Sequence, residues 1–340
     1  MPVIIPKDIP AFNALEKSVF VMDTKRAFLQ DIRPLEILLI NLMPTKIETE
    51  NQILSLLANS PLQVTITLLA TQSYVGKNTP QTHLDRFYKY FDQIKNKRFD
   101  GAIVTGAPIE LMKFEEVQYW DELREIMDFL RSHATSTLYL CWGAMAGLYH
   151  FHGIQKVALE RKLFGVFEHS IVGDDVLLSG LNDIVKMPHS RHSGIDLGTK
   201  TSKSELKILL QGAQSGASML KDKQDIFILG HPEYALYTLD EEYKRDKQKG
   251  LEISAPQNYY KADSKGAGAN DKGANSEGAD NKGARVNGAG TNGEGANGGS
   301  ANAESTNSKP LMTWRSDASV IFGNWLNFSV YQDTPFDLSC

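Results

Sequence analysis

The chain has 340 residues, of which 41% are hydrophobic and 23% are charged, and its formal net charge is −5. This is the composition of an ordinary globular protein, and its mildly acidic balance argues against nucleic acid as the main partner. No stretch approaches the ~20 apolar residues that cross a bilayer, and the first residues lack a basic region followed by an apolar one. We therefore expect neither a membrane span nor secretion.

Apolar runs alternate with amphipathic stretches through the first half of the chain. The continuous apolar run at 36–42 indicates a strand that is covered on both faces. The alternation predicts a doubly wound, mostly parallel α/β sheet with helices on both faces. Strands are predicted over 36–42, 63–69, 101–105 and 136–140, and helices from residue 48 onward and over 82–97, 117–133 and 143–148.

The second half has more β signal. A strand is predicted over 227–230, followed by a charged helix over 239–250. Residues 319–322, with an aromatic helix or strand over 324–331, are expected to return the chain to the core.

Low-complexity sequence lies between these parts, over residues 264–308. Glycine recurs there at every fifth residue from Gly268 to Gly298, and Leu, Ile, Phe, Tyr and Trp are missing from the segment. Such a segment has too little apolar surface to offset the entropy cost of ordering. We expect a disordered surface insertion in a single domain spanning 1–340, with a partner-binding linker as the alternative.

The chain contains two cysteines, Cys141 and Cys340. Two cysteines build no disulfide framework, so a reducing, cytoplasmic setting is expected. Cys141 directly follows the strand predicted over 136–140 and precedes small residues that suit a helix. Functional groups collect at such strand ends in open α/β sheets.

The position of Cys141 is that of a nucleophile elbow. The amides and dipole of the following helix would favour thiolate over thiol, and the Trp142 amide would be an oxyanion donor. A buried structural cysteine is the alternative.

His231 and Glu233 stand at the end of the strand predicted over 227–230. Residues two apart in an extended segment project to the same side, so Glu233 can hold the His231 ring while its other nitrogen faces Cys141. These roles describe a Cys-His-Glu triad, although His-Pro-Glu alone would suit a surface turn. Residues 105–110 supply a further turn, whose amides can complete the oxyanion site.

Together these residues belong to a series of motifs that resembles the homoserine O-acyltransferases with a class I glutamine amidotransferase-like, flavodoxin-like fold. The series runs in order along nearly the whole chain outside the repeat. It comprises NLMPTKIETE at 41–50, TGAP at 105–108, TLYLCWGA at 137–144, GVFEH at 165–169, PHSR at 188–191, GHPEY at 230–234 and TWRS at 313–316.

The resemblance implies a ping-pong acyl transfer for methionine biosynthesis. Cys141 would attack the thioester of an acyl-coenzyme A and hold the acyl group. His231 would then take the proton of the L-homoserine hydroxyl, with Glu233 orienting the imidazole, and such general-base help is worth ~10²–10⁴ in rate. No permanently bound cofactor is implied, because acyl-CoA is a substrate.

The resemblance also assigns residues outside the triad. It gives Lys162, Ser190 and Arg245 to substrate binding, with Arg245 taking the amino-acid carboxylate. Lys46 is a weaker candidate for steadying the oxyanion or the coenzyme. Without the resemblance, Lys162, Ser190 and Arg245 would each be an ordinary solvated or capping residue.

Glu110 stands at the position that the family associates with donor choice, where glutamate accompanies acetyl donors and glycine succinyl donors. A carboxylate there would fill the space of a longer acyl chain and repel the terminal carboxylate of succinyl-CoA. We therefore expect acetyl-CoA as donor, with a solvent-facing Glu110 of no effect as the alternative.

Two other functions remain open from the sequence: a succinyl-CoA-dependent enzyme and an amidotransferase-like binding protein without catalysis. The intact Cys141, His231 and Glu233 argue against the latter. The remaining histidines form no persuasive metal set, so we expect no metal. The family suggests a homodimer, and neither nucleic acid nor a membrane is expected as partner.

Overall fold

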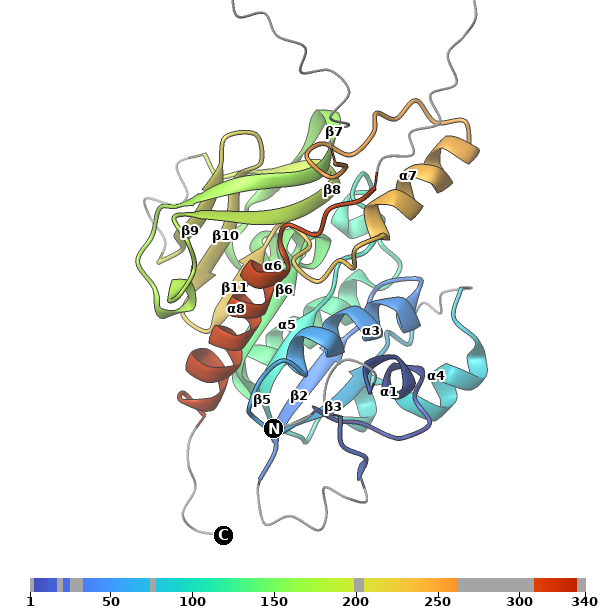
Figure 1. Ribbon diagram of the computed structural model, residues 1–340. Helices are drawn as coiled ribbons and strands as arrows, with labels where there is room; N and C mark the ends of the chain where they lie inside the picture. Colours follow the sequence, from blue (N-terminus) through green and yellow to red (C-terminus); the bar gives the residue numbers. More distant parts are fainter. Residues whose placement is uncertain are drawn as a thin grey trace, which may run out of the picture.

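A computed structural model of the chain describes residues 3–16, 21–24, 33–73, 78–198, 205–261 and 309–334 (Figure 1). The repeat at 264–308 and Cys340 lie outside the described residues, so the predicted disorder of the repeat is not tested. None of the described helices combines the length and the apolar character that a bilayer span requires.

Half of the sheet is parallel. Its strands lie in the spatial order β1 (Val3–Ile4), β3 (Val64–Leu69), β2 (Leu35–Ile40), β5 (Phe99–Val104), β6 (Ala134–Leu140) and β11 (Asp225–Ile228). Side chains of β2 alternate between the two faces of the sheet. Ile37 and Leu39 pack into the hydrophobic core on one face, and Leu38 and Ile40 pack into the core on the other. Both faces of the parallel strands are therefore covered, and the predicted doubly wound α/β class is confirmed.

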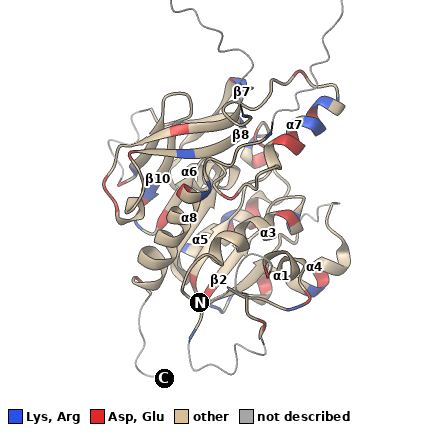
Figure 2. Cartoon of the chain, in the orientation of Figure 1, with Lys and Arg blue, Asp and Glu red and all other residues tan. Residues whose placement is uncertain are grey.

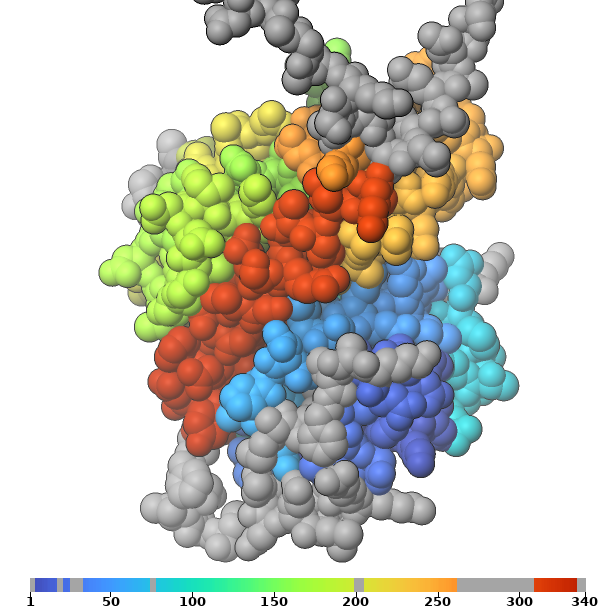
Figure 3. All heavy atoms as spheres, in the orientation of Figure 1, coloured from blue at the N-terminus to red at the C-terminus, as the bar shows by residue number. Residues whose placement is uncertain are grey.

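Helices cover the two faces of the parallel strands. The first face holds α1 (Pro10–Leu15), α3 (Lys46–Leu57), α8 (Arg315–Asn324) and the π-helix η5 (Trp325–Tyr331). The second face holds α5 (Trp120–His133) and α6 (Trp142–His152). The described segment after the repeat thus returns to the core as expected. On the face seen in Figure 3 it lies between the N-terminal half of the chain on one side and the β7–β8 strand pair on the other.

In the other half of the sheet every pair of neighbouring strands is antiparallel, beginning with β11 and β10. It continues from β11 through β10 (Gly216–Asp222), β9 (Lys207–Gly212), β7 (Gln155–Ile171) and β8 (Ile184–Asp196). The long strands β7 and β8 were not located from the sequence. They extend above the parallel strands, and α7 (Thr238–Gln248) lies beside them (Figure 1).

The helix predicted over 82–97 is wrong in its length. Helix α4 spans only Gln81–Phe87, and the chain continues as β4 (Tyr88–Lys89) and the short η1 (Phe91–Gln93). β4 pairs with β3 through Leu68 and Tyr88, and the Tyr88 hydroxyl donates a 2.6 Å hydrogen bond to the buried Glu50. Strand pairing and this buried hydrogen bond together outweigh the helical spacing of the apolar residues.

Candidate active site

Cys141 occupies a sharp turn between β6 and α6. Its φ is 46° and its ψ is −112°, a conformation that non-glycine residues avoid and that costs of order 1–3 kcal/mol. The turn is held by a 2.7 Å hydrogen bond from the Cys141 amide to the Ile228 carbonyl and by a 3.1 Å bond from Met145 to the Cys141 carbonyl. This is the predicted nucleophile-elbow geometry, and the side chain is buried with 3% of the residue exposed.

Two glycines allow the backbone to close around this turn. A Cβ on Gly143 would lie 2.6 Å from the Thr105 carbonyl oxygen, so only glycine lets α6 approach the end of β5 this closely. A Cβ on Gly106 would lie 3.3 Å from the Cys141 Cβ and 3.6 Å from His231 Cε1. The turn after β5 therefore borders the space between the two side chains.

His231 stands between Glu233 and Cys141. Its Nδ1 lies 2.7 Å from Glu233 Oε1, and its ring is within hydrogen-bonding reach of the Cys141 side chain. The Tyr234 ring stacks on the imidazole with centroids 4.1 Å apart. Because Nδ1 is used by Glu233, Nε2 is the nitrogen left for Cys141, and the structure brings the three predicted triad residues together.

The charge state of His231 follows from these neighbours. Burial by itself lowers the pKa of the imidazole, but the negative charges of Cys141 and Glu233 and their hydrogen bonds outweigh it and raise the pKa well above its ordinary value. The geometry therefore favours a protonated, positively charged His231 ring beside Cys141.

A second polar cluster joins β7, β8 and α7. Lys162 on β7 donates a 2.6 Å hydrogen bond to Glu242 Oε1 and a 3.3 Å bond to Asp246 Oδ2. Ser190 on β8 donates to the same Glu242 oxygen at 2.6 Å. The structure thus brings two of the predicted substrate residues together on one carboxylate of α7, a helix that carries both acidic and basic side chains (Figure 2).

Arg245, the third predicted substrate residue, lies on the same helix. Its Nε and Nη2 donate to Asp246 Oδ1 at 3.0 and 2.9 Å, and 57% of its side chain is exposed. In this structure its guanidinium therefore contacts Asp246 at the rim of the cluster.

Tyr234 connects the two clusters. It is buried, stacks on His231, and its phenol interacts electrostatically with Glu242 of the second cluster and with Cys141 and Glu233 of the triad. Burial, followed by these negative charges, raises the pKa of Tyr234 well above its ordinary value, so the phenol stays neutral.

Glu110 lies in the turn that follows β5 and docks on β8. Its Oε2 accepts a short hydrogen bond from the His192 amide, and its carbonyl accepts one of 3.1 Å from Ser193 Oγ. The Glu110 carboxylate is therefore held against β8 and is only partly exposed, and its effect on donor choice stays a prediction.

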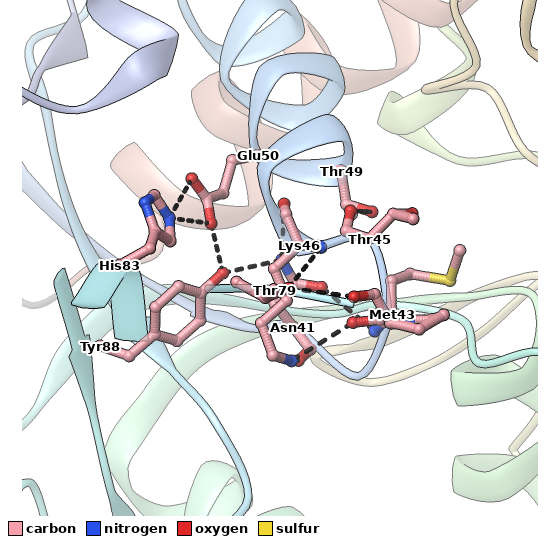
Figure 4. A network of polar contacts seen from close by, with 10 residues as sticks. Asn41, Met43, Thr45, Lys46, Thr49, Glu50, Thr79, His83 and Tyr88 are labelled. Carbon is pink, nitrogen blue, oxygen red and sulfur yellow. Dashed lines mark hydrogen bonds and ion pairs between the residues drawn. The ribbon is translucent and has the colours of Figure 1, made fainter. Parts of the chain in front are cut away.

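Lys46, at the start of α3, lines a cavity of about 350 Å³ beside the turn after β5. Its ammonium donates a short hydrogen bond to the Asn41 carbonyl and one of 3.3 Å to the Met43 carbonyl (Figure 4). Burial lowers the pKa of Lys46 to about 8, against the opposing pull of Glu50.

The network in Figure 4 continues from Lys46 to a fully buried carboxylate. Asn41 Nδ2 donates to the Tyr88 hydroxyl at 2.9 Å, and that hydroxyl donates to Glu50 at 2.6 Å. His83 Nε2 lies 3.0 Å from the same carboxylate. The start of α3, which carries Lys46, is thus anchored by side chains from α3, α4 and β4.

Three residues around the second polar cluster, Glu242, Asp246 and Tyr234, were given no role from the sequence. Glu242 and Asp246 are spaced four apart on a predicted helix that also carries Arg245, and this spacing was the signal that could have found them. Tyr234 lay within the motif at 230–234 without an assigned role. In the part of the chain that the structure describes, no group of His, Cys, Asp and Glu is arranged to hold a metal ion.

The geometry can be set beside known proteins. A model of the homoserine O-succinyltransferase family matches residues 2–336. A homoserine O-acetyltransferase from Campylobacter jejuni (strain RM1221) is 50% identical over 341 residues, covering 99% of this chain and 100% of that protein. A homoserine O-acetyltransferase from Clostridium beijerinckii is 45% identical over 343 residues, covering 100% and 99%. Among solved structures, a glutamine amidotransferase from Thermotoga maritima has a TM-score of 0.46 at 11% identity, covering 64% of this chain and 84% of its own.

Proposed function

Because the chain belongs to the homoserine O-succinyltransferase family and is thus an acyltransferase, we propose that it transfers the acetyl group of acetyl-CoA to the hydroxyl of L-homoserine. The observation that carries this proposal is the buried Cys141 in its strained turn, with the His231 and Glu233 pair beside it. The names of its relatives support the acetyl donor.

In the first half-reaction the Cys141 thiolate attacks the carbonyl carbon of the acetyl thioester. A new carbon–sulfur bond forms, the bond to coenzyme A breaks, and the departing thiolate takes the proton from His231 Nε2. The raised pKa of His231 supports this step, because the imidazolium holds a proton for the leaving group.

In the second half-reaction the homoserine hydroxyl attacks the acetyl-enzyme. Its proton passes to His231 Nε2, its oxygen bonds to the acetyl carbon, and Cys141 leaves as thiolate. Acylation removes the negative charge of Cys141, which lowers the pKa of His231 and frees its nitrogen as a base. Glu233 keeps the ring in place through both steps.

Two backbone regions are placed to stabilise the oxyanion. The Trp142 amide is at the first position of α6, where an N–H has no carbonyl one turn earlier to bond. The turn at Gly106 borders both Cys141 and His231 and is the second source of donors.

The cluster on α7 suits the zwitterionic end of homoserine. The Arg245 side chain is exposed, so its guanidinium can release Asp246 and bind the substrate carboxylate instead. The planar guanidinium can donate two parallel hydrogen bonds to a carboxylate. Glu242, already bonded to Lys162 and Ser190, is positioned to accept from the ammonium group. Tyr234 stacks on His231 and interacts electrostatically with Glu242 and Cys141, which supports a homoserine site shared between this cluster and the triad.

The test is a steady-state comparison of donors with purified enzyme. We expect parallel double-reciprocal lines for acetyl-CoA and L-homoserine, as in a ping-pong reaction, and a higher kcat/KM for acetyl-CoA than for succinyl-CoA. The family model carries the succinyl name, and a preference for succinyl-CoA would overturn the acetyl assignment while leaving acyl transfer intact. We also propose a homodimer, which light scattering in solution would test.

A further inference from the structure

Arg191 on β8 is a buried cation that forms no ion pair with any carboxylate of the described residues. Only 1% of the residue is exposed. Nε donates to His189 Nδ1 at 3.3 Å, Nη1 to the Ser193 carbonyl at 2.5 Å, and Nη2 to the Ser215 carbonyl at 2.7 Å. Three of its five N–H groups are thus bonded, and none of the described carboxylates lies within ion-pair distance. A buried charge of this kind is costly unless an opposite charge is near.

The position of Arg191 is fixed by a directed chain of hydrogen bonds. Since Arg191 donates to His189 Nδ1, the neutral His189 carries its proton on Nε2 and donates to His169 Nε2, 3.0 Å away. His169 Nδ1 then donates to the Val185 carbonyl at 3.2 Å. Each donor in this chain has an acceptor, so the guanidinium is held rigidly.

The two histidines contribute no charge to this cluster. Burial, with the nearby Arg191, lowers the pKa of His169 to about 4 and the pKa of His189 well below its ordinary value. Arg191 is therefore the permanent positive charge of the cluster.

Two negative groups face Arg191 from other elements. Glu110 bonds to the His192 amide and to Ser193 Oγ, the two residues that follow Arg191 on β8. Cys141 and Glu110 both interact electrostatically with the guanidinium and oppose the effect of its burial. The Glu110 carboxylate is thus held at a fixed place beside Arg191 without touching it.

We propose that Arg191 determines the acyl donor together with Glu110, because Glu110 supplies the counter-charge that the terminal carboxylate of a dicarboxylic acyl group would otherwise supply. The inference rests on the proposed acyl transfer. With Glu110 present, its carboxylate repels the terminal carboxylate of a succinyl group and already balances the positive charge of Arg191. Without the Glu110 side chain, the vacated space beside Arg191 accepts a carboxylate from the donor, and the buried charge is balanced again.

The experiment is a double-mutant cycle on the full-length protein. Wild type, Glu110→Gly, Arg191→Met and the double variant are assayed with acetyl-CoA and succinyl-CoA. We expect Glu110→Gly to raise the ratio of kcat/KM for succinyl-CoA to that for acetyl-CoA at least tenfold, and Arg191→Met to remove that gain. Arg191→Lys should keep part of it, and Arg124→Met, at an exposed arginine of α5, should change nothing.

A second measurement needs no change at Arg191 and guards against loss of folding. Glu110→Gly is assayed with succinyl-CoA and with its methyl ester, which has the added length but no terminal charge. We expect the charged donor to be preferred about tenfold or more. Equal use of the two donors would overturn the inference, as would a succinyl gain that survives Arg191→Met or a Glu110→Gly enzyme that gains no succinyl transfer. Failure of the proposed function is distinguishable, since wild type would then transfer no acetyl group.

Discussion

Nδ1 of His231 lies 2.7 Å from Oε1 of Glu233, while the second oxygen of that carboxylate is buried without a hydrogen-bond partner among the described residues. Among the described residues, the Glu233 carboxylate therefore has its hydrogen bond to the His231 imidazole alone. It fixes which nitrogen faces Cys141 and stabilises the positive charge of the ring.

Replacing Glu233 by glutamine should therefore cost activity and little else. Glu233→Gln keeps the shape but removes the charge, and we expect kcat/KM for acetyl transfer to fall about 10²–10⁴-fold. Steady-state assays with both substrates measure the loss. Glu168→Gln, at an exposed position of β7, is the control, and a Glu233→Gln enzyme as active as this control would contradict the assigned role.

The pKa of His231 should depend on Cys141. The pKa is raised because Cys141 and Glu233 outweigh the effect of burial, so the imidazolium persists to a higher pH than in an ordinary histidine. In Cys141→Ala one of the two raising groups is lost, and the ring should give up its proton at a lower pH. NMR titration of the histidine rings, assigned with His231→Gln, measures the shift. An unchanged pKa in Cys141→Ala would show that the two side chains do not interact.

Glu110→Gln separates charge from volume in donor choice. Glutamine fills the same space but neither repels a succinyl carboxylate nor balances Arg191. If charge dominates, Glu110→Gln should gain succinyl transfer toward the level of Glu110→Gly, whereas a purely steric role predicts no gain. The ratio of kcat/KM for the two donors is the measurement.

Gly143 should not tolerate a side chain. A Cβ there would lie 2.6 Å from the Thr105 carbonyl oxygen and 3.0 Å from that of Val104, both backbone atoms. We expect Gly143→Ala to lower the free energy of unfolding by about 1–3 kcal/mol and to reduce activity by displacing the start of α6. Denaturant unfolding tests the first effect.

The matched control for Gly143→Ala is a glycine on α8. A Cβ added at Gly323 would meet no atom of the described residues within 4 Å, so Gly323→Ala should be neutral or stabilising by roughly 0.5–1 kcal/mol. If the two variants are equally stable, the close approach of α6 to β5 is not what requires glycine at 143.

The parallel strands and the elbow could be predicted from sequence because their signal is local. The apolar run at 36–42 and the small residues after Cys141 each encode their structure within a few positions. The outer part of β7 carries no such signal, since none of its residues over 155–162 is buried, and its long pairing with β8 depends on tertiary contacts.

The sequence predicted contacts between residues that are close in the chain, and it missed contacts between residues that come from different elements. His231 and Glu233 are two apart, and the structure places them in a turn after β11, where the Tyr234 amide donates a 3.2 Å hydrogen bond to the His231 carbonyl. Their contact is therefore local, although the turn and not the expected extended segment produces it. The burial of Arg191 depends on the Ser215 carbonyl, 24 residues away, and on His189 and His169 from two strands. No spacing in the sequence encodes such an arrangement.

The central claim is that Cys141 carries the acetyl group between the two substrates. The most direct measurement is acid-quenched mass spectrometry of the enzyme after mixing with acetyl-CoA alone, followed by peptide mapping. We predict one added acetyl group on the peptide that contains Cys141, and its disappearance when L-homoserine is added before the quench. An enzyme that turns over at the normal rate while that peptide stays unmodified, or a Cys141→Ala variant with wild-type activity, would contradict the account.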